Sequence, residues 1–167
     1  MRSNLFTLPI LLTCLAGGSL AAQDFRLGVQ GGLVLPSGDL SDSASLGLQV
    51  GGHARWDFGR GHGLMARADL TSFGRKDGYG SSSLGIGADY TYHFDRARRG
   101  VYVLAGLSAQ NYSRDFPDGT SRDSGLGIDL GAGYDLDRNL GLQARFTSVN
   151  AGHDTLTALC LGVTYTF

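Results

Sequence analysis

The chain ends in Leu161-Gly162-Val163-Thr164-Tyr165-Thr166-Phe167, a stretch in which apolar side chains occupy every second position up to a terminal aromatic residue. Successive side chains of a β-strand point to opposite faces, so the apolar residues share one face, and the glycine and threonines share the other. In a soluble barrel or sandwich such an apolar face points inward, whereas in a barrel that spans a membrane it points to lipid. The rest of the chain has to distinguish these two cases.

The same alternation recurs upstream and predicts an all-β chain. In the fourth segment, for example, Ile86 and Tyr90 fall on the face opposite Asp89. Each segment is close in length to the roughly 9–11 residues with which a tilted strand crosses a bilayer. The eight predicted strands are Phe25–Leu35, Leu46–Phe58, Leu64–Phe73, Leu84–Phe94, Val101–Tyr112, Leu126–Leu136, Leu140–Val149 and Leu156–Phe167.

The connections between these segments alternate between long and short. Polar and mostly long connections, rich in Gly, Asp and Ser, are predicted at 36–45, 74–83, 113–125 and 150–155. Short connections are predicted at 59–63, 95–100 and 137–139. Outer-membrane barrels have short periplasmic turns and longer outside loops. The pattern therefore predicts an up-and-down antiparallel barrel with both termini on the short-turn, periplasmic side.

Aromatic residues on the apolar faces gather near the short-turn ends, as in a belt at a membrane interface. These are Phe25, Trp56, Phe58, Tyr90, Tyr92, Phe94, Tyr134, Tyr165 and Phe167. A soluble barrel of lipocalin type is the alternative, with the apolar faces inside. It is disfavoured because it leaves Arg and Asp side chains outside and gives no reason to sort aromatic residues to one end.

The polar faces of the strands carry charged residues of both signs. An eight-stranded barrel is just wide enough for its inward side chains to fill it. We therefore predict an interior network of ion pairs and hydrogen bonds. Its predicted members are Arg26, Arg55, Arg67, Asp69, Asp89, Asp129 and Arg145. The alternative is a narrow polar pore or a carrier for small ligands, suggested by the number of small inward glycines.

The N-terminus predicts export. Arg2 precedes an apolar run over about Leu5–Ala16, and Ala21 and Ala22 offer small residues for cleavage. The run is shorter than the roughly 20 residues of a spanning helix. We therefore predict a cleaved signal peptide over 1–22 and a single barrel domain over 23–167. Cys160 is then the one remaining cysteine, which excludes an intramolecular disulfide in the exported chain.

Composition excludes several kinds of partner. The formal net charge is −1, from 14 Lys+Arg and 15 Asp+Glu, and gives no reason to expect nucleic-acid binding. All the acidic residues are Asp, and the chain contains no Glu. No Cys, His or carboxylate spacing in the sequence imposes a metal geometry, so we expect neither a metal nor a cofactor.

With its export signal, eight alternating segments, loop asymmetry and terminal Tyr165-Thr166-Phe167, the chain resembles the small outer-membrane β-barrel family typified by OmpX-like and OmpA-like barrels. The resemblance implies an eight-stranded transmembrane barrel in the outer membrane, in contact with lipid and lipopolysaccharide. It further implies that the barrel-assembly machinery recognises Val163, Tyr165 and Phe167. We expect a monomer with a structural or surface-interaction role. The chain stops after the eighth strand, without the peptidoglycan-binding domain of the OmpA pattern.

A lipid A-modifying enzyme is a further alternative. The stretch 145–152 resembles the active-site segment of the lipid A deacylase family, but Thr147 and Val149 replace its catalytic His and Ser. The acidic partner in that family is a Glu, which this chain lacks. Ser148, His153 and Asp154 supply the right groups for a relay, yet proximity in sequence does not create relay geometry. We therefore expect a protein without enzymatic activity.

Overall fold

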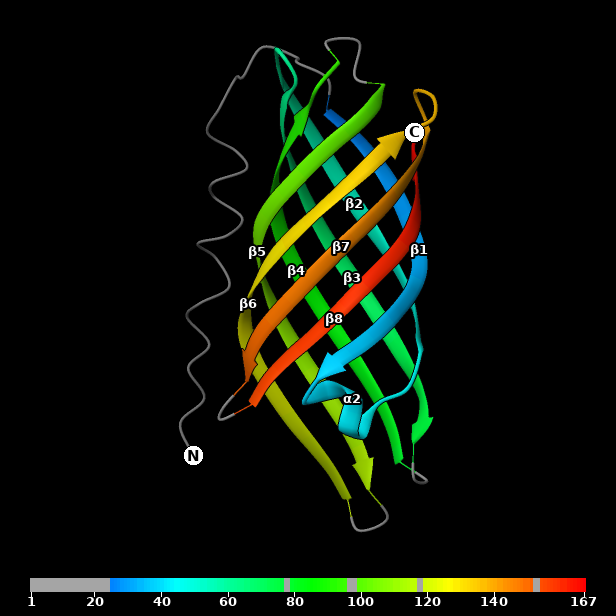
Figure 1. Ribbon diagram of the computed structural model, residues 1–167, viewed down its shortest axis with the longest axis vertical. Coiled ribbons are helices and arrows are strands. Elements are labelled where there is room, and N and C mark those ends of the chain that lie inside the picture. Colours follow the sequence, from blue (N-terminus) through cyan, green and yellow to red (C-terminus); the bar gives the residue numbers. More distant parts are fainter. Residues whose placement is uncertain (1–24, 77–78, 96–98, 117–118, 152–153) are drawn as a thin grey trace.

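The computed structural model describes residues 25–76, 79–95, 99–116, 119–151 and 154–167, so the predicted signal peptide at 1–22 lies outside the described residues. Eight antiparallel strands follow one another around a closed barrel, and the last strand pairs with the first (Figure 1). The predicted all-β, up-and-down barrel is confirmed. The strands are β1 (Phe25–Gly38), β2 (Gly47–Gly59), β3 (His62–Lys76), β4 (Tyr79–His93), β5 (Gly100–Phe116), β6 (Gly119–Asp135), β7 (Leu140–Ala151) and β8 (Asp154–Thr166).

The stretch that ends the chain also closes the barrel. In β8, Tyr165 lies opposite Val29 and Gly162 lies opposite Gly32 of β1. The backbone N–H of Phe167 donates a hydrogen bond of 2.8 Å to the carbonyl oxygen of Leu27. Closure leaves no strand edge in the wall. A β-sheet can cross hydrocarbon only when all its backbone N–H and C=O groups are paired in this way.

The two ends of the barrel differ. We call the end that carries the β2–β3, β4–β5 and β6–β7 connections the turn end, and the opposite end the hairpin end. Phe167 lies at the turn end, where the chain finishes (Figure 1). At the β2–β3 connection, Gly59, Arg60 and Gly61 all have positive φ angles, of 87°, 55° and 89°. This left-handed run turns the chain within three residues.

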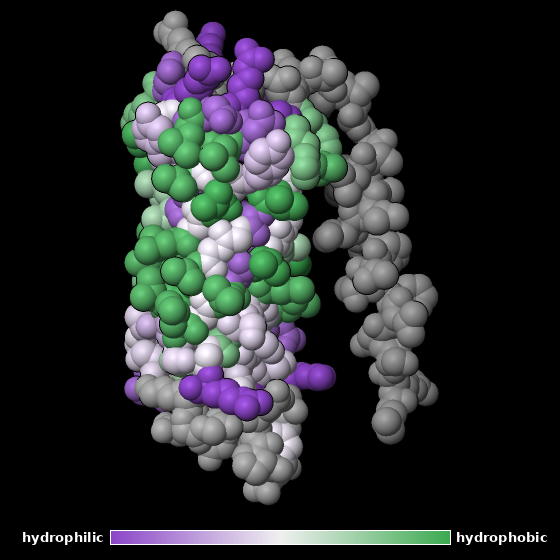
Figure 2. All heavy atoms as spheres, turned by 90° about the vertical axis from the view of Figure 1, so that its right-hand side faces the viewer, coloured by the Kyte–Doolittle hydropathy of each residue, from purple (hydrophilic) through white to green (hydrophobic). Residues whose placement is uncertain are grey.

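The faces of the strands follow the predicted alternation. In β6, the side chains of Ile128 and Leu130 are 58% and 56% exposed, whereas Asp129 between them is fully buried. Figure 2 shows hydrophobic residues over the middle of one side of the barrel and hydrophilic residues toward its ends. Exposed hydrophobic side chains in this number mark contact with an apolar environment. The outward faces are therefore the lipid-facing faces.

The aromatic residues meet at the turn end, as predicted. The rings of Phe25 and Trp56 are 4.9 Å apart between centroids, and those of Tyr165 and Phe167 are 5.5 Å apart. Most of these side chains point out of the barrel, and Phe167 is 69% exposed. The Trp and Tyr rings combine an apolar body with a polar group, which suits the membrane interface.

Two of the predicted long loops are wrong. The polar residues of 74–83 and 113–125 mostly continue the strands, because β3 runs to Lys76 and β6 begins at Gly119. Ser113 pairs with Arg122 in this extension of the β5–β6 ladder. The prediction ended each strand where the apolar residues end, at the edge of the hydrocarbon layer. Antiparallel backbone hydrogen bonds need no apolar side chains, so the strands continue past that edge. The hairpins therefore extend beyond the apolar band.

The predicted loop at 36–45 is also wrong in part, because it contains the short helix α2 (Leu40–Ser43). Figure 1 shows α2 at the hairpin end, against the end of β1. The side chain of Leu40 is 1% exposed, so the helix is anchored in the barrel rather than lying on its surface. Among the described residues, no helix is long and apolar enough to span a membrane.

The face assignment predicts how charge is tolerated. Replacing lipid-facing Leu130 by Arg should lower the free energy of unfolding by about 2–4 kcal/mol, because a cation near the bilayer midplane loses its hydration. The measurement is denaturant unfolding of the protein in lipid vesicles. Leu130→Ala is the control and should cost less, since it adds no charge. Equal losses for both variants would mean that Leu130 does not face hydrocarbon.

Candidate functional site: the barrel interior

The interior of the barrel is arranged in three levels along its axis. Polar and charged side chains occupy the turn end, a compact charged cluster fills the middle, and apolar side chains fill the hairpin end. All three levels are built from the inward positions of the strands, with α2 added at the hairpin end. Together, the three levels decide whether anything can pass through the barrel or bind inside it.

The middle level is organised around Arg67 of β3. Its guanidinium contacts Asp69 on the same strand at 2.5 Å, Asp89 of β4 at 3.0 Å and Asp129 of β6 at 2.7 Å. The side chains of Arg67, Asp89 and Asp129 are fully buried. A guanidinium has five N–H donors in a fixed plane and can thus serve several carboxylates at once.

Arg145 of β7 extends this middle cluster. It contacts Asp69 at 3.3 Å and donates a hydrogen bond of 3.1 Å to the side-chain carbonyl of Gln49. Gln30 also donates to Asp69, and the Thr147 hydroxyl donates to Asp129 at 2.5 Å. Two arginines therefore face three aspartates, with neutral donors supplying part of the remaining hydrogen bonding. A buried charge is tolerated only when it is paired and hydrogen-bonded in this way.

Inward glycines make room for this cluster. Gly87 lies opposite Arg67 in the β3–β4 ladder, and a Cβ added to it would lie 2.8 Å from the Arg67 guanidinium. Gly106 lies opposite Asp89, and a Cβ there would overlap the carboxylate. The high glycine content of the strands thus has a steric cause, because an eight-stranded barrel is narrow.

The turn-end level contains separate, smaller pairs. Asp135 accepts from Arg55 at 3.3 Å and from His93 at 2.9 Å, and Arg26 pairs with Asp57 at 3.2 Å. The guanidinium carbon of Arg55 also lies 5.2 Å from the centroid of the Tyr102 ring, within the range of a cation–π contact. The turn-end level is therefore closed by paired side chains around a buried aromatic ring.

The residues predicted as one interior network are thus divided between two levels. The structure brings together Arg67, Asp69, Asp89, Asp129 and Arg145 in the middle. Arg26 and Arg55 instead belong to the turn end, with Asp57 and Asp135 as partners. Partners on distant strands depend on the shear and diameter of the barrel, which alternation in the sequence does not specify.

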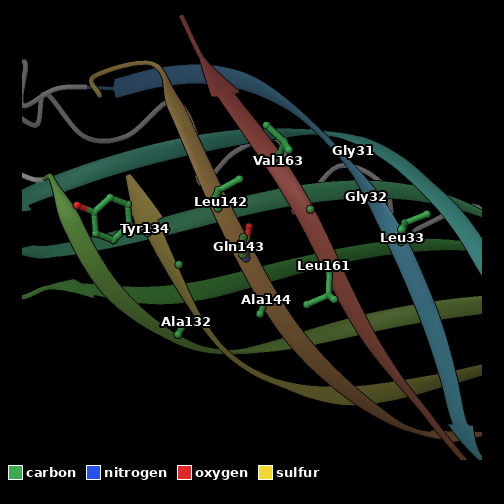
Figure 3. Close-up of a pocket in the computed structure, with 12 residues that line it drawn as sticks. Gly31, Gly32, Leu33, Ala132, Tyr134, Leu142, Gln143, Ala144, Leu161 and Val163 are labelled. Atoms are coloured by element: carbon green, nitrogen blue, oxygen red, sulfur yellow. The ribbon is translucent and has the colours of Figure 1, made fainter. Parts of the chain in front are cut away.

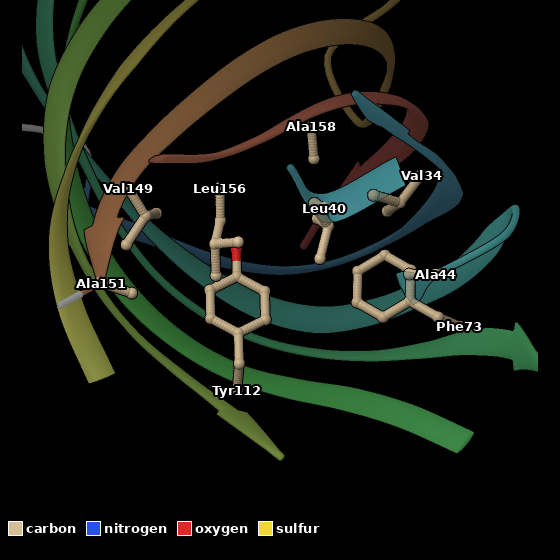
Figure 4. Packing of buried hydrophobic residues seen from close by; sticks show 9 residues of the cluster. All are labelled: Val34, Leu40, Ala44, Phe73, Tyr112, Val149, Ala151, Leu156 and Ala158. Carbon is tan, nitrogen blue, oxygen red and sulfur yellow. The ribbon is translucent and has the colours of Figure 1, made fainter. Parts of the chain in front are cut away.

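The hairpin end is filled by an apolar plug that sequence reasoning missed. Leu40 of α2 packs among inward side chains of the strands, including Phe73 and Tyr112, each 6% exposed (Figure 4). A signal for it exists in the sequence, because inward positions turn apolar where these strands end. The plug consists of Val34, Leu40, Ala44, Phe73, Tyr112, Val149, Ala151, Leu156 and Ala158.

Little space remains between the levels. One cavity of about 10 Å³ is bordered by Gln30, Gln143 and Arg145, and a second of about 20 Å³ by Thr71, Ser83 and Tyr112. A cavity of about 10–15 Å³, measured as the space open to the centre of a water molecule, is just large enough for one water. These two cavities in the described interior therefore have room for isolated waters only.

The residues considered for metal or nucleophilic chemistry can be followed in the part of the chain that the structure describes. No group of three or more His, Cys or Asp side chains there has the spacing to hold a metal ion. The hydroxyl of Thr147, which stands where the deacylase family has its His, donates to Asp129. Of the other conceivable relay, Ser148, His153 and Asp154, His153 lies outside the described residues.

A closed eight-stranded barrel with an apolar outer face, an aromatic belt and a filled polar interior defines a small transmembrane β-barrel of the outer membrane. The match of the sequence to a family model agrees with this class. The chain belongs to the family described as outer membrane protein beta-barrel domain, whose model matches residues 7–167. The resemblance drawn from the sequence is confirmed, and the family supports location in the outer membrane.

Solved structures share this architecture. Neisserial surface protein A superposes with a TM-score of 0.62 at 19% identity, over 86% of this chain and 97% of that one. The N-terminal barrel of OprF from Pseudomonas aeruginosa gives 0.56 at 18% identity, over 85% and 97%. Ail of Yersinia pestis gives 0.54 at 14% identity, over 86% and 96%. These identities support likeness of fold alone, and no curated protein matches the sequence significantly.

The charged cluster predicts a large and specific destabilisation. Arg67→Met should lower the free energy of unfolding by about 3–5 kcal/mol, because it leaves buried carboxylates without their cation. Adding Asp129→Asn should restore part of the loss, so the double variant is more stable than additivity predicts. Denaturant unfolding in vesicles measures both, with the exposed Arg60→Gln as control. A loss below about 1 kcal/mol would show that Arg67 does not hold the cluster together.

Proposed function

We propose that the protein is a closed outer-membrane barrel with a structural and surface-interaction role, and that it neither conducts solutes nor catalyses a reaction. The observation that carries this proposal is the filling of the interior at all three levels. A pore needs a continuous aqueous path, whereas the cavities of the described interior measure about 10 and 20 Å³. A carrier of small ligands needs a pocket of about 300–1,000 Å³. The packed interior favours the structural role over both.

The proposed orientation places the turn end and both termini in the periplasm and the hairpin end outside the cell. Its support is that the β3–β4 and β5–β6 hairpins continue as paired strands beyond the apolar band at the hairpin end. Outer-membrane barrels have short turns on the periplasmic side and longer segments outside. The strands of the β5–β6 hairpin have 17 residues each, against 12 and 13 for β7 and β8. This hairpin reaches furthest at the end that we assign to the exterior (Figure 1).

The proposed surface interaction uses the outer part of β6. The β6–β7 ladder begins at Leu126 opposite Asn150, so within the described chain residues 119–125 pair with β5 only. The other edge of this segment offers backbone N–H and C=O groups to an extended peptide. Arg122 is exposed on the same segment and suits a phosphate of lipopolysaccharide. Surrounding lipid, lipopolysaccharide and an extracellular protein segment are therefore the proposed partners of a monomeric barrel.

For biogenesis, we propose that the barrel-assembly machinery recognises the end of β8 through Val163, Tyr165 and Phe167. These side chains are 46%, 45% and 69% exposed on the lipid-facing side of the strand that closes the barrel. A signal on the last strand is read before closure, when its pairing with β1 has not yet formed. The exposure of all three side chains after closure means that the folded barrel does not need them for its interior packing.

Conductance tests the proposed closed barrel. The purified protein, inserted in planar bilayers, should give no discrete current steps, because side chains obstruct each interior level. A general porin in the same bilayers provides the positive control. Reproducible openings of the native barrel would overturn the proposal in favour of the narrow pore.

Assembly in cells tests the proposed role of the terminal residue. Phe167→Ala should reduce the heat-modifiable folded form in the outer membrane, while spontaneous refolding of the purified protein into vesicles stays close to native. Phe94→Ala is the matched control, since Phe94 is 64% exposed and directly follows β4, as Phe167 directly follows β8. If both variants assemble alike in cells, Phe167 is no more than one member of the aromatic belt.

A further inference from the structure

A groove runs along the lipid-facing wall of β6, β7, β8 and β1, with a volume of about 670 Å³ (Figure 3). It exists because three outward positions carry small residues, Gly31, Ala132 and Ala144, where neighbouring positions carry larger ones. Tyr134 and Leu161 are among the larger residues at its border. The groove opens toward hydrocarbon, so its occupant in the membrane is apolar where it touches these residues.

Register places the residues of the groove in two neighbouring rows across the four strands. The first row, nearer the turn end, consists of Tyr134, Leu142, Val163 and Gly31. The second row consists of Ala132, Ala144, Leu161 and Leu33. The groove therefore starts one residue inside the end of β6 and runs toward the middle of the wall. This is the depth of the acyl chains in the leaflet at the turn end.

A cationic residue lies in the turn next to the groove. The turn that joins β6 to β7 carries the exposed Arg138, four residues after Tyr134 and four before Leu142. The Asp137 carboxylate accepts from the backbone N–H groups of Asn139 at 2.7 Å and Leu140 at 2.8 Å. These hydrogen bonds, the one from Leu140 most of all, lower the pKa of Asp137 and stabilise the turn.

The same turn is tied to the other side of the groove. The carbonyl oxygen of Arg138 accepts a hydrogen bond of 3.0 Å from the guanidinium of Arg26 on β1. The strand that contributes Gly31 is thereby linked to the turn that presents Arg138. An apolar groove beside a turn that carries an exposed arginine suits an amphiphile with an anionic headgroup.

We propose that this groove binds one anionic phospholipid, with an acyl chain along Gly31, Ala132 and Ala144 and the phosphate at Arg138. The choice of leaflet rests on the proposed orientation, which turns this end toward the periplasm. A second copy of the chain fits less well. A parallel two-fold contact through the groove brings the two Arg138 side chains together at the same depth, and their charges repel.

Quenching by brominated lipid tests the site. The reporter is Tyr134→Trp in a Trp56→Phe background, which leaves one tryptophan beside the groove; Leu142→Trp is a second reporter should the first fail to fold. The barrel is reconstituted in phosphatidylcholine vesicles with increasing brominated phosphatidylglycerol. Half-maximal quenching should occur at a mole fraction of brominated phosphatidylglycerol about fivefold lower than that of brominated phosphatidylcholine. This is roughly the gain in affinity for an anionic lipid that one arginine at the surface contributes.

Three variants locate the effect. Arg138→Gln should remove the preference for phosphatidylglycerol, and Ala144→Leu should reduce quenching by both lipids, because it fills the groove. Arg60→Gln, on the β2–β3 turn across the barrel from the groove, should change neither. In the native chain, Trp56 on β2 should report no preference.

Equal curves for the two lipids, or a preference that survives Arg138→Gln, would overturn the proposal. The proposal would also be overturned if lipid A displaced the brominated phosphatidylglycerol from the reporter better than unlabelled phosphatidylglycerol does. The anion site would then belong to the outer leaflet. Failure of the closed-barrel function appears separately, as current through the same protein in planar bilayers.

Discussion

The structure depends on one constraint, that hydrocarbon cannot hydrogen-bond to a peptide group. Every N–H and C=O in the wall must therefore be paired within the sheet, and only closure of β8 onto β1 achieves this for the outermost strands. Closure fixes which side chains meet lipid and which meet one another. The alternation of Ile128, Asp129 and Leu130 follows directly, with the aspartate buried and both neighbours exposed.

A narrow closed barrel with polar inward faces must then neutralise its own interior. Arg67 does so in the middle by contacting three carboxylates, and inward glycines provide the space that it needs. At the hairpin end the chain uses apolar packing instead, with Leu40 inserted from α2. Both solutions place packed side chains in the lumen, which supports the proposed role of the outer surfaces: the polar hairpins, and the lipid-facing wall with its groove.

Much of the fold could be predicted from the sequence, because lipid imposes a period of two on every strand and collects aromatic residues near the interface. The features that could not be predicted are those formed by residues that do not contact lipid. The polar stretches around Ser81 and Ser121 continue as strands, although their composition is typical of loops. Leu40 lies between polar neighbours, so nothing local marks it as buried. The division of Arg55 and Arg67 between two levels follows from barrel shear, which has no local signal.

The central claim is that the alternating outward side chains of this barrel meet hydrocarbon while their neighbours are packed inside. Spin labels placed singly along β6 from Leu126 to Asp135, in a cysteine-free background in lipid vesicles, test it most directly. We expect collision rates with oxygen to be high at Leu126, Ile128 and Leu130 and low at Gly127 and Asp129, with low access to a water-soluble relaxation agent throughout. High access of the water-soluble agent at the inward positions would contradict the filled interior, and loss of the period of two would contradict the barrel's orientation toward lipid.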